Sequence, residues 1–423
     1  MNPMPKYEYY KDSGIDWLGL IPANWSIVPA KRRHRVIKSI NKQNQCENVL
    51  SLTLRGVVNN NPDSPEGLIP SDYASYQIFE KDDLVFKLID LENIKTSRVG
   101  IVHELGIMSP AYIRMRVNSS HYPKYVYYYF YNLYLNSVYN NLGAGVRSTL
   151  GPSDLLEIKV IEPSFDEQVA IANFLDQKLL QIDEAIAIKE KQITLLKERK
   201  QIIIQQAVTL GLDPRVPLMD TDLSWAPKIA SHWSLLPNRL FIKIRRIPVG
   251  LAHKNYQLLS LTKQGILIRD LSTGAGKQSD FLERMQEVRK GDLIFCLFDV
   301  EETPRTVGLS WHLGMISADY TIFECIDEHT GRFLEYFYKN IDDQKLLKPL
   351  YKGLRNRIPK PKFLRTNCPM PPKKELIKIV NYLDAVEVDT ARSIEMILTQ
   401  IEKLKEYKTT LINSAVTGKI KVA

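Results

Sequence analysis

Apolar residues recur with helical spacing along two long stretches, one in the middle of the chain and one at its C-terminal end. In the first stretch they are Leu175, Leu179, Ile182, Ile186, Ile193, Leu196, Ile203 and Ala207, and in the second they are Leu383, Ile394, Ile397, Ile401, Leu404, Leu411 and Ala415. Steps of three and four residues over about five heptads predict the seam of a coiled coil. A proline precedes each stretch (Pro163, Pro371) and a glycine follows each one (Gly211, Gly418), at positions that suit the start and the end of a helix.

Polar residues interrupt this seam. Lys200 and Lys408 occupy the same seam position in the two stretches, and Lys189, Glu387 and Thr390 interrupt it elsewhere. One interpretation is an irregular seam in which lysine stems reach toward water. The other is that polar seam residues set the register and orientation of the helix pair. The sequence leaves both interpretations open.

The region before each predicted helix has a different pattern. Short runs of β-branched and aromatic residues, broken by Gly, Pro and Asn, predict short strands. They are VLSLTL, DLVFKLI and YIRMRV in the first region, and LLSLT, DLIFCLF and YTIFEC in the second. The aromatic stretches YVYYYFYNLY and FLEYFYKN predict a helix packed on each sheet. Their spacing of three and four residues favours core packing over the stacking of nucleic-acid bases.

The chain repeats itself at an offset of 208 residues. Trp17 and Trp25 match Trp225 and Trp233, VGIVHELGIMSPAY matches VGLSWHLGMISADY, and GVRSTL matches GLRNRI. So many matches at one offset indicate two homologous halves. We therefore predict a first lobe at 1–162, a first spacer helix at 163–212, a second lobe at 213–370 and a second spacer helix at 371–423. The predicted fold class is α+β: mixed α/β lobes, an antiparallel two-helix coiled coil that separates them, and an internal pseudo-two-fold repeat.

Two similar lobes joined to long helices suit a protein that reads a split site on duplex DNA, where half-sites face the same side one helical turn apart. The lobes differ widely outside their matched framework, so we expect them to read different sequences. Charge agrees with a DNA partner: the whole chain carries a net +9, residues 1–163 carry 18 basic and 16 acidic groups, and residues 213–372 carry 24 and 18. Basic clusters occur at residues 31–35 and at Arg355, Arg357, Lys360, Lys362 and Arg365, although each cluster alone could be a solvated surface.

Several classes of chemistry have no sequence signature here. The chain has no N-P-P-[FY] or D-P-P-[FY] methyltransferase motif, no H-E-x-x-H and no G-x-S-x-G. The segment from Gly274 to Lys277 resembles a phosphate loop, but Leu271 and Gln278 stand where a Walker motif needs glycine and Ser or Thr. Four scattered cysteines predict reduced thiols rather than a zinc site. We find no membrane-spanning run and no signal peptide, and we expect a non-catalytic cytoplasmic protein without a cofactor or metal of its own.

Two segments resemble a known family, the DNA-specificity subunits of Type I restriction–modification enzymes. YKDSGIDWLGLIPANW (10–25) is similar to their N-terminal signature, and PSFDEQVAIANFLDQKLLQIDEAI (163–186), with the pair Glu167-Gln168, is similar to their first spacer region. The second copy departs from this pattern, because PPKKELIKIVNYLD has Glu375-Leu376 in place of Glu-Gln. The resemblance covers essentially the whole chain.

The resemblance implies two target-recognition domains separated by paired helices. It also implies double-stranded DNA, two adenine methyltransferase subunits and two restriction (translocase–nuclease) subunits as partners. S-adenosylmethionine, ATP and magnesium would then be bound by those partners, and the family contributes no catalytic residues to this chain. The alternatives are a coiled-coil scaffold that binds proteins and a self-contained DNA methyltransferase.

Basic and polar residues in matched loops are the candidates for DNA contact. They are Arg55, Arg98, Arg147, Lys263, Gln264, Arg305, Arg355 and Arg357. Because Arg147 and Arg355 match across lobes that should read different sequences, we assign them to phosphate rather than to bases. The alternative for any one of these arginines is an ion pair within its own lobe.

Overall fold

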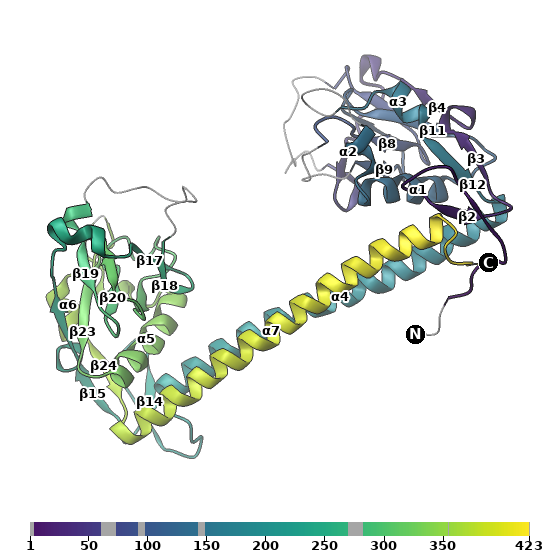
Figure 1. Ribbon diagram of the computed structural model, residues 1–423. Coiled ribbons are helices and arrows are strands. Elements are labelled where there is room, and N and C mark those ends of the chain that lie inside the picture. The colour runs from purple at the N-terminus through teal and green to yellow at the C-terminus, as the bar shows by residue number, and fades with distance from the viewer. Residues whose placement is uncertain are drawn as a thin grey trace. The chain divides into compact units, whose positions relative to one another are not determined.

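The computed structural model describes residues 4–60, 73–91, 98–142, 149–269, 282–353 and 355–422. Two predicted features, Arg147 and the segment Gly274–Lys277, lie outside these residues. The chain forms two compact units (Figure 1): unit 1 contains Met1–Lys189 and Leu398–Ala423, and unit 2 contains Glu190–Ile397. Each unit therefore includes part of both long helices.

Unit 1 is built on a four-stranded antiparallel sheet with the strand order β4-β11-β8-β9. These strands are β4 (His34–Ile37), β8 (Leu84–Phe86), β9 (Val99–Ile101) and β11 (Ile113–Val117). Four antiparallel pairs surround it: β1 (Tyr10–Asp12) with β2 (Leu20–Pro22), β3 (Ser26–Pro29) with β12 (Lys159–Glu162), β5 (Leu50–Thr53) with β6 (Gly56–Asn59), and β7 (Gln77–Phe79) with β10 (Gly106–Met108). The helices of the lobe are α1 (Pro123–Leu135), α2 (Val138–Leu142) and α3 (Pro152–Glu157).

The aromatic stretch of the first half forms α1, which packs against the sheet. Tyr125, Tyr129 and Phe130 are buried in the main core of the unit. The Phe130 ring meets the Phe86 ring of β8 edge to face, at 5.2 Å between ring centroids. This core also includes residues of both long helices, so α1 is covered on both sides. The aromatic residues therefore have the packing role that their spacing favoured.

Unit 2 repeats this architecture strand for strand. Its four-stranded sheet has the order β16-β23-β20-β21, formed by β16 (Ile242–Arg245), β20 (Leu293–Phe295), β21 (Val307–Leu309) and β23 (Thr321–Cys325). The pairs are β13 (Leu218–Asp220) with β14 (Lys228–Ala230), β15 (Ser234–Pro237) with β24 (Asn367–Met370), β17 (Leu259–Thr262) with β18 (Gly265–Ile268), and β19 (Gln286–Val288) with β22 (Gly314–Ile316). Its lobe helices are α5 (Glu328–Asp343) and α6 (Lys360–Arg365). The matching topology confirms the predicted α+β repeat.

The two long helices are α4 (Phe165–Thr209) and α7 (Lys373–Val416). Both are followed by a glycine in the left-handed region, Gly211 (φ +83°) and Gly418 (φ +72°). All of the seam residues Leu175, Ile182, Ile186, Ile193, Leu196, Ile203, Ile394, Ile397, Ile401, Leu404 and Leu411 are buried or half-buried. Among the described helices, none is both long and apolar enough to cross a membrane.

Polar seam residues join the two helices within unit 1. The Lys408 ammonium donates to both carboxylate oxygens of Asp183 (2.7 and 2.8 Å), and the Lys189 ammonium donates to Gln400 (2.5 Å). Position increases along α4 as it decreases along α7, so the helices are antiparallel in this unit. The partners of Lys189 and Lys408 agree with a register-setting role, whereas Lys200 makes no hydrogen bond or ion pair among the described residues.

Candidate nucleic-acid interface

Matching hairpin tips present three of the candidate DNA-contacting residues. Arg55 lies between β5 and β6, and Lys263 and Gln264 lie between β17 and β18, all with exposed side chains. In each hairpin a threonine hydroxyl, of Thr53 or Thr262, accepts the backbone N–H two residues ahead (3.1 Å) and donates to the carbonyl of the following glycine (3.0 Å). The same local bonds therefore hold different side chains at the same place in the two units.

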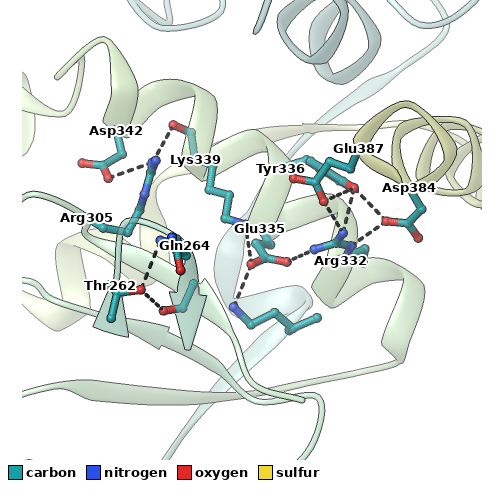
Figure 2. Close-up of polar contacts among 12 residues, drawn as sticks. Thr262, Gln264, Arg305, Arg332, Glu335, Tyr336, Lys339, Asp342, Asp384 and Glu387 are labelled. Atoms are coloured by element: carbon teal, nitrogen blue, oxygen red, sulfur yellow. Dashed lines mark hydrogen bonds and ion pairs between the residues drawn. The ribbon is translucent and has the colours of Figure 1, made fainter. Parts of the chain in front are cut away.

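Two other candidates are held inside their own lobes. The Arg98 side chain is 2% exposed, and its guanidinium donates to the carbonyls of Ile89 (3.2 Å) and Asp90 (2.8 Å). Burial lowers the pKa of Arg98. The Arg305 guanidinium pairs with Asp342 (3.3 Å), as Figure 2 shows. It also pairs with Asp343 (2.8 Å). Both arginines stabilise the lobe in this conformation, and neither belongs to the exposed basic surface.

The remaining described candidates, Arg355 and Arg357, are exposed on one turn of unit 2. The Arg355 guanidinium pairs with Asp299 (2.5 Å) and lies over the ring of Phe298, at 5.6 Å from its centroid. The sequence match between Arg355 and Arg147 stays a prediction about function, because Arg147 lies outside the described residues.

The edge strand of each four-stranded sheet carries a further set of exposed basic residues. β4 and β16 are edge strands, and three positions on or beside each of them are basic in both halves of the chain. They are Lys31, Arg35 and Lys38 in unit 1 and Arg239, Lys243 and Arg246 in unit 2, all exposed. Lysine and arginine are exchanged at every one of these positions, which preserves charge but not the planar fork of arginine. Such an exchange suits contact with phosphate as a point charge, and it also suits an edge protected against strand pairing.

A polar junction attaches each lobe to a long helix. In unit 1, Tyr128 and Lys124 of α1 both bond the carboxylate of Asp176 on α4, the tyrosine hydroxyl at 2.6 Å. Burial raises the pKa of Tyr128, with a further contribution from its bond to Asp176. The hydroxyl is therefore a donor at any ordinary pH.

The junction is repeated in unit 2 at the same offset of 208 residues. Tyr336 and Arg332 of α5 bond Asp384 on α7, at 2.7 and 2.8 Å, and Arg332 also pairs with Glu387 (2.7 Å) and Glu335 (2.5 Å), as Figure 2 shows. Our sequence analysis missed these residues. The sequence does contain a signal for them, because a tyrosine, a basic residue and an aspartate occur at matched positions of the predicted helices in both halves.

A tryptophan–glutamate pair marks the start of each long helix. The indole N–H of Trp25 donates to Glu167 (3.3 Å), and that of Trp233 donates to Glu375 (3.2 Å). The glutamate of the Glu-Gln pair is therefore the member retained in the second copy, and it makes the same bond there.

The change from Gln168 to Leu376 is compensated nearby. In unit 1 the Gln168 side chain accepts the Tyr122 backbone N–H at the start of α1 (3.0 Å). In unit 2 the matching N–H, of Thr330, donates instead to Asp327 (2.9 Å). Leu376 is thereby free to join the apolar core of unit 2, where it is buried.

The cysteines are all free. Within the described ranges, no three His, Cys, Asp or Glu side chains gather as a metal site would require. No family model matches the chain, and no curated protein matches it in sequence.

Solved structures are similar over nearly the whole length. One is a chain from a structure that describes complex assembly and conformational transition of the type I R-M system. The TM-score is 0.66 and the sequence identity is 12%, and the match covers 95% of this chain and 99% of that one. Another is the HsdS subunit from Thermoanaerobacter tengcongensis, with a TM-score of 0.54, 13% identity, and coverage of 95% and 98%. At these identities the likeness establishes the fold. The resemblance drawn from the sequence is therefore confirmed as a shared architecture.

Proposed function

We propose that this chain is the DNA-specificity subunit of a Type I restriction–modification complex. Each lobe reads one half of a bipartite target on double-stranded DNA, and the chain itself catalyses no reaction. Two adenine methyltransferase subunits and two restriction subunits assemble on it and supply the chemistry. The methyltransferase subunits bring S-adenosylmethionine, and the restriction subunits bring ATP and magnesium.

One observation carries this proposal: the two units share their framework and differ on their exposed tips. The hairpin turn, the lobe–helix junction and the tryptophan–glutamate pair are the same in both units. The residues at the hairpin tips differ, with Arg55 in one unit and Lys263 and Gln264 in the other. A shared framework with different tips suits two readers of different half-sites held by one kind of support.

The long helices offer a surface for partner subunits. Several large apolar side chains on α4 and α7 are at least half exposed, and they would be costly to leave in water. They are Leu180, Ile188, Leu195 and Ile202 on α4, and Val388, Met396 and Leu398 on α7. We assign this surface to the methyltransferase subunits. The isolated chain should accordingly be poorly soluble or bind DNA weakly.

Methylation mapping tests the proposal. The chain is coexpressed with the methyltransferase from its own operon in a host without other adenine methylation, and modified positions are mapped across the host genome. We expect adenine methylation at one bipartite motif that is lost when the chain is omitted. Methylation without a bipartite motif, or methylation that persists without the chain, would contradict it. Methyl transfer by the purified chain alone would instead favour a self-contained methyltransferase, and assembly without any sequence preference would favour a scaffold.

A further inference from the structure

A constrained turn in unit 2 presents two arginines beside a pocket. Lys352 and Arg357 pair their backbones in both directions, with N···O distances of 2.9 and 3.2 Å. The Asp299 backbone N–H donates to the carbonyl of Arg355 between them (2.8 Å). These bonds fix the backbones of Lys352, Arg355 and Arg357 relative to one another and to Asp299 without the help of a ligand. The arginine side chains therefore start from a fixed backbone, which reduces the entropy lost on binding.

The pocket has a volume of about 510 Å³ and combines basic groups with an aromatic wall. Its lining includes Phe298, Asp319, Thr321, Arg355, Arg357 and Lys360. Lys360 stands between Pro359 and Pro361, whose rings restrict the backbone on both sides. Basic side chains thus reach the pocket from two stiff segments.

Positive charge is in excess at this pocket. Arg355 pairs with Asp299, and Asp319 adds one negative charge to a lining that also contains Arg357 and Lys360. No carboxylate among the described residues forms an ion pair with Arg357, with Lys360 or with Arg246, which follows β16.

Lys360 is also affected by the charges of two arginines. The pKa of Lys360 is lowered, first by burial and then by the charges of Arg246 and Arg357. Like charges repel one another, and a bound anion would reduce that repulsion.

Unit 1 does not repeat this cluster. At the offset of 208 residues, Arg246 corresponds to Lys38, but Arg357 corresponds to Thr149 and Lys360 to Pro152. The helix that follows differs in the same direction: α3 is acidic, and Glu157 pairs with Lys31 (2.6 Å), whereas α6 is basic. The excess charge is therefore a property of unit 2 and not of the shared framework.

We infer that Arg357 and Lys360 form a phosphate-binding site for the DNA backbone in unit 2, at positions where unit 1 has Thr149 and Pro152. This inference rests on the proposed function. Because a phosphodiester carries no sequence information, the site contributes to binding of every duplex and holds the second lobe on DNA more firmly than the first.

The salt dependence of DNA binding tests this site. The complex of the full chain with its methyltransferase subunits is titrated with a fluorescent mixed-sequence duplex between 50 and 200 mM KCl. The double variant Arg357→Gln, Lys360→Gln is compared with Lys228→Gln, Lys254→Gln, which removes the same charge from exposed positions elsewhere in unit 2. Thermal unfolding of both variants confirms that the lobe is intact.

Removing one phosphate contact should lower the slope of log K against log salt by about 0.9, so the loss of affinity should be about 3.5-fold larger at 50 mM than at 200 mM salt. The control variant Lys228→Gln, Lys254→Gln should retain the wild-type slope. The double variant Arg357→Lys, Lys360→Arg should also retain this slope, because a positive charge at each position is enough to bind phosphate. The methylated motif should be unchanged in all variants.

Other outcomes overturn the inference. An unchanged slope with weaker subunit assembly would make the cluster a protein contact. Inhibition of wild-type binding by inorganic phosphate, beyond the effect of ionic strength and absent from the double variant, would assign the site to a small anion. A changed base preference at one position of the motif would make Arg357 a base reader. Loss of the bipartite motif from the wild type would instead refute the proposed function itself.

Discussion

Replacing Arg114 by Ile should destabilise unit 1, and placing an arginine on the neighbouring strand should restore much of the loss. Arg114 and Asp83 form a buried ion pair, with side chains 1% and 2% exposed and a distance of 2.5 Å. Asp83 also accepts the Glu80 backbone N–H (2.8 Å), so its charge is part of a turn that the fold needs. Removal of the arginine leaves a carboxylate in the core with weaker compensation.

The magnitude follows from burial. Removing one partner of a buried ion pair lowers the free energy of unfolding by about 3–5 kcal/mol. Because Arg116 still reaches Asp83 at 3.2 Å, we expect a value near the lower end of this range. For a unit of this size, about 3 kcal/mol should lower the midpoint of thermal unfolding by roughly 6–12 °C.

The second unit supplies the compensating change. There the matching carboxylate, Asp292, is paired with Arg245 on β16 rather than with a residue of β23. Arg245 faces Ile322 across the two strands, whereas in unit 1 Arg114 of β11 faces Ile37 of β4. The arginine and the isoleucine have therefore exchanged strands. The double variant Ile37→Arg, Arg114→Ile copies the second arrangement into the first.

Differential scanning calorimetry of the single and double variants measures the effect on the unfolding transition of unit 1. We expect the double variant to recover at least half of the loss, while the transition of unit 2 stays in place. A single variant that costs less than about 1 kcal/mol would contradict the estimate from burial. A double variant less stable than the single one would show that the two sheets are not interchangeable at this pair.

Two further predictions concern unit 1. Burial, and then the charge of His121, lowers the pKa of His34 to about 4, so the neutral form is favoured in the folded state and stability should fall by about 3 kcal/mol as pH decreases from about 6.5 toward 4. His34→Ile, which copies Ile242 of unit 2, should remove most of this dependence in urea unfolding, and an equally steep pH profile in the variant would contradict it. Tyr128→Phe should cost about 1.5–3 kcal/mol because a hydrogen bond to the Asp176 carboxylate is lost, and a change below about 0.5 kcal/mol would exclude a role for that bond.

Much of the fold could be predicted from the sequence because local periodicity indicates the helices and strands, and because the same pattern occurs in both halves of the chain. A seam with steps of three and four residues specifies a helix with one apolar face, and short β-branched runs between turn residues specify strands. The repeat at 208 residues then requires both halves to fold alike. The glycines after the long helices could be placed as well, because the left-handed conformation at Gly211 and Gly418 costs glycine little.

The site could be predicted only in part, because the role of a charged side chain depends on partners far away in the chain. Arg98 and Arg355 look alike as loop arginines, yet one is buried against backbone carbonyls and the other is exposed. Trp25 and Glu167, which are 142 residues apart in sequence, meet only once the long helix packs on the lobe.

Which strand supplies the partner of a buried aspartate was also decided by the tertiary structure. Asp83 and Asp292 need one arginine each, and either of two adjacent strands can provide it, because both bring a side chain to the same buried carboxylate. Local pattern determines the elements of this protein and their repetition. Packing determines which of its charges are buried within a unit and which stay exposed.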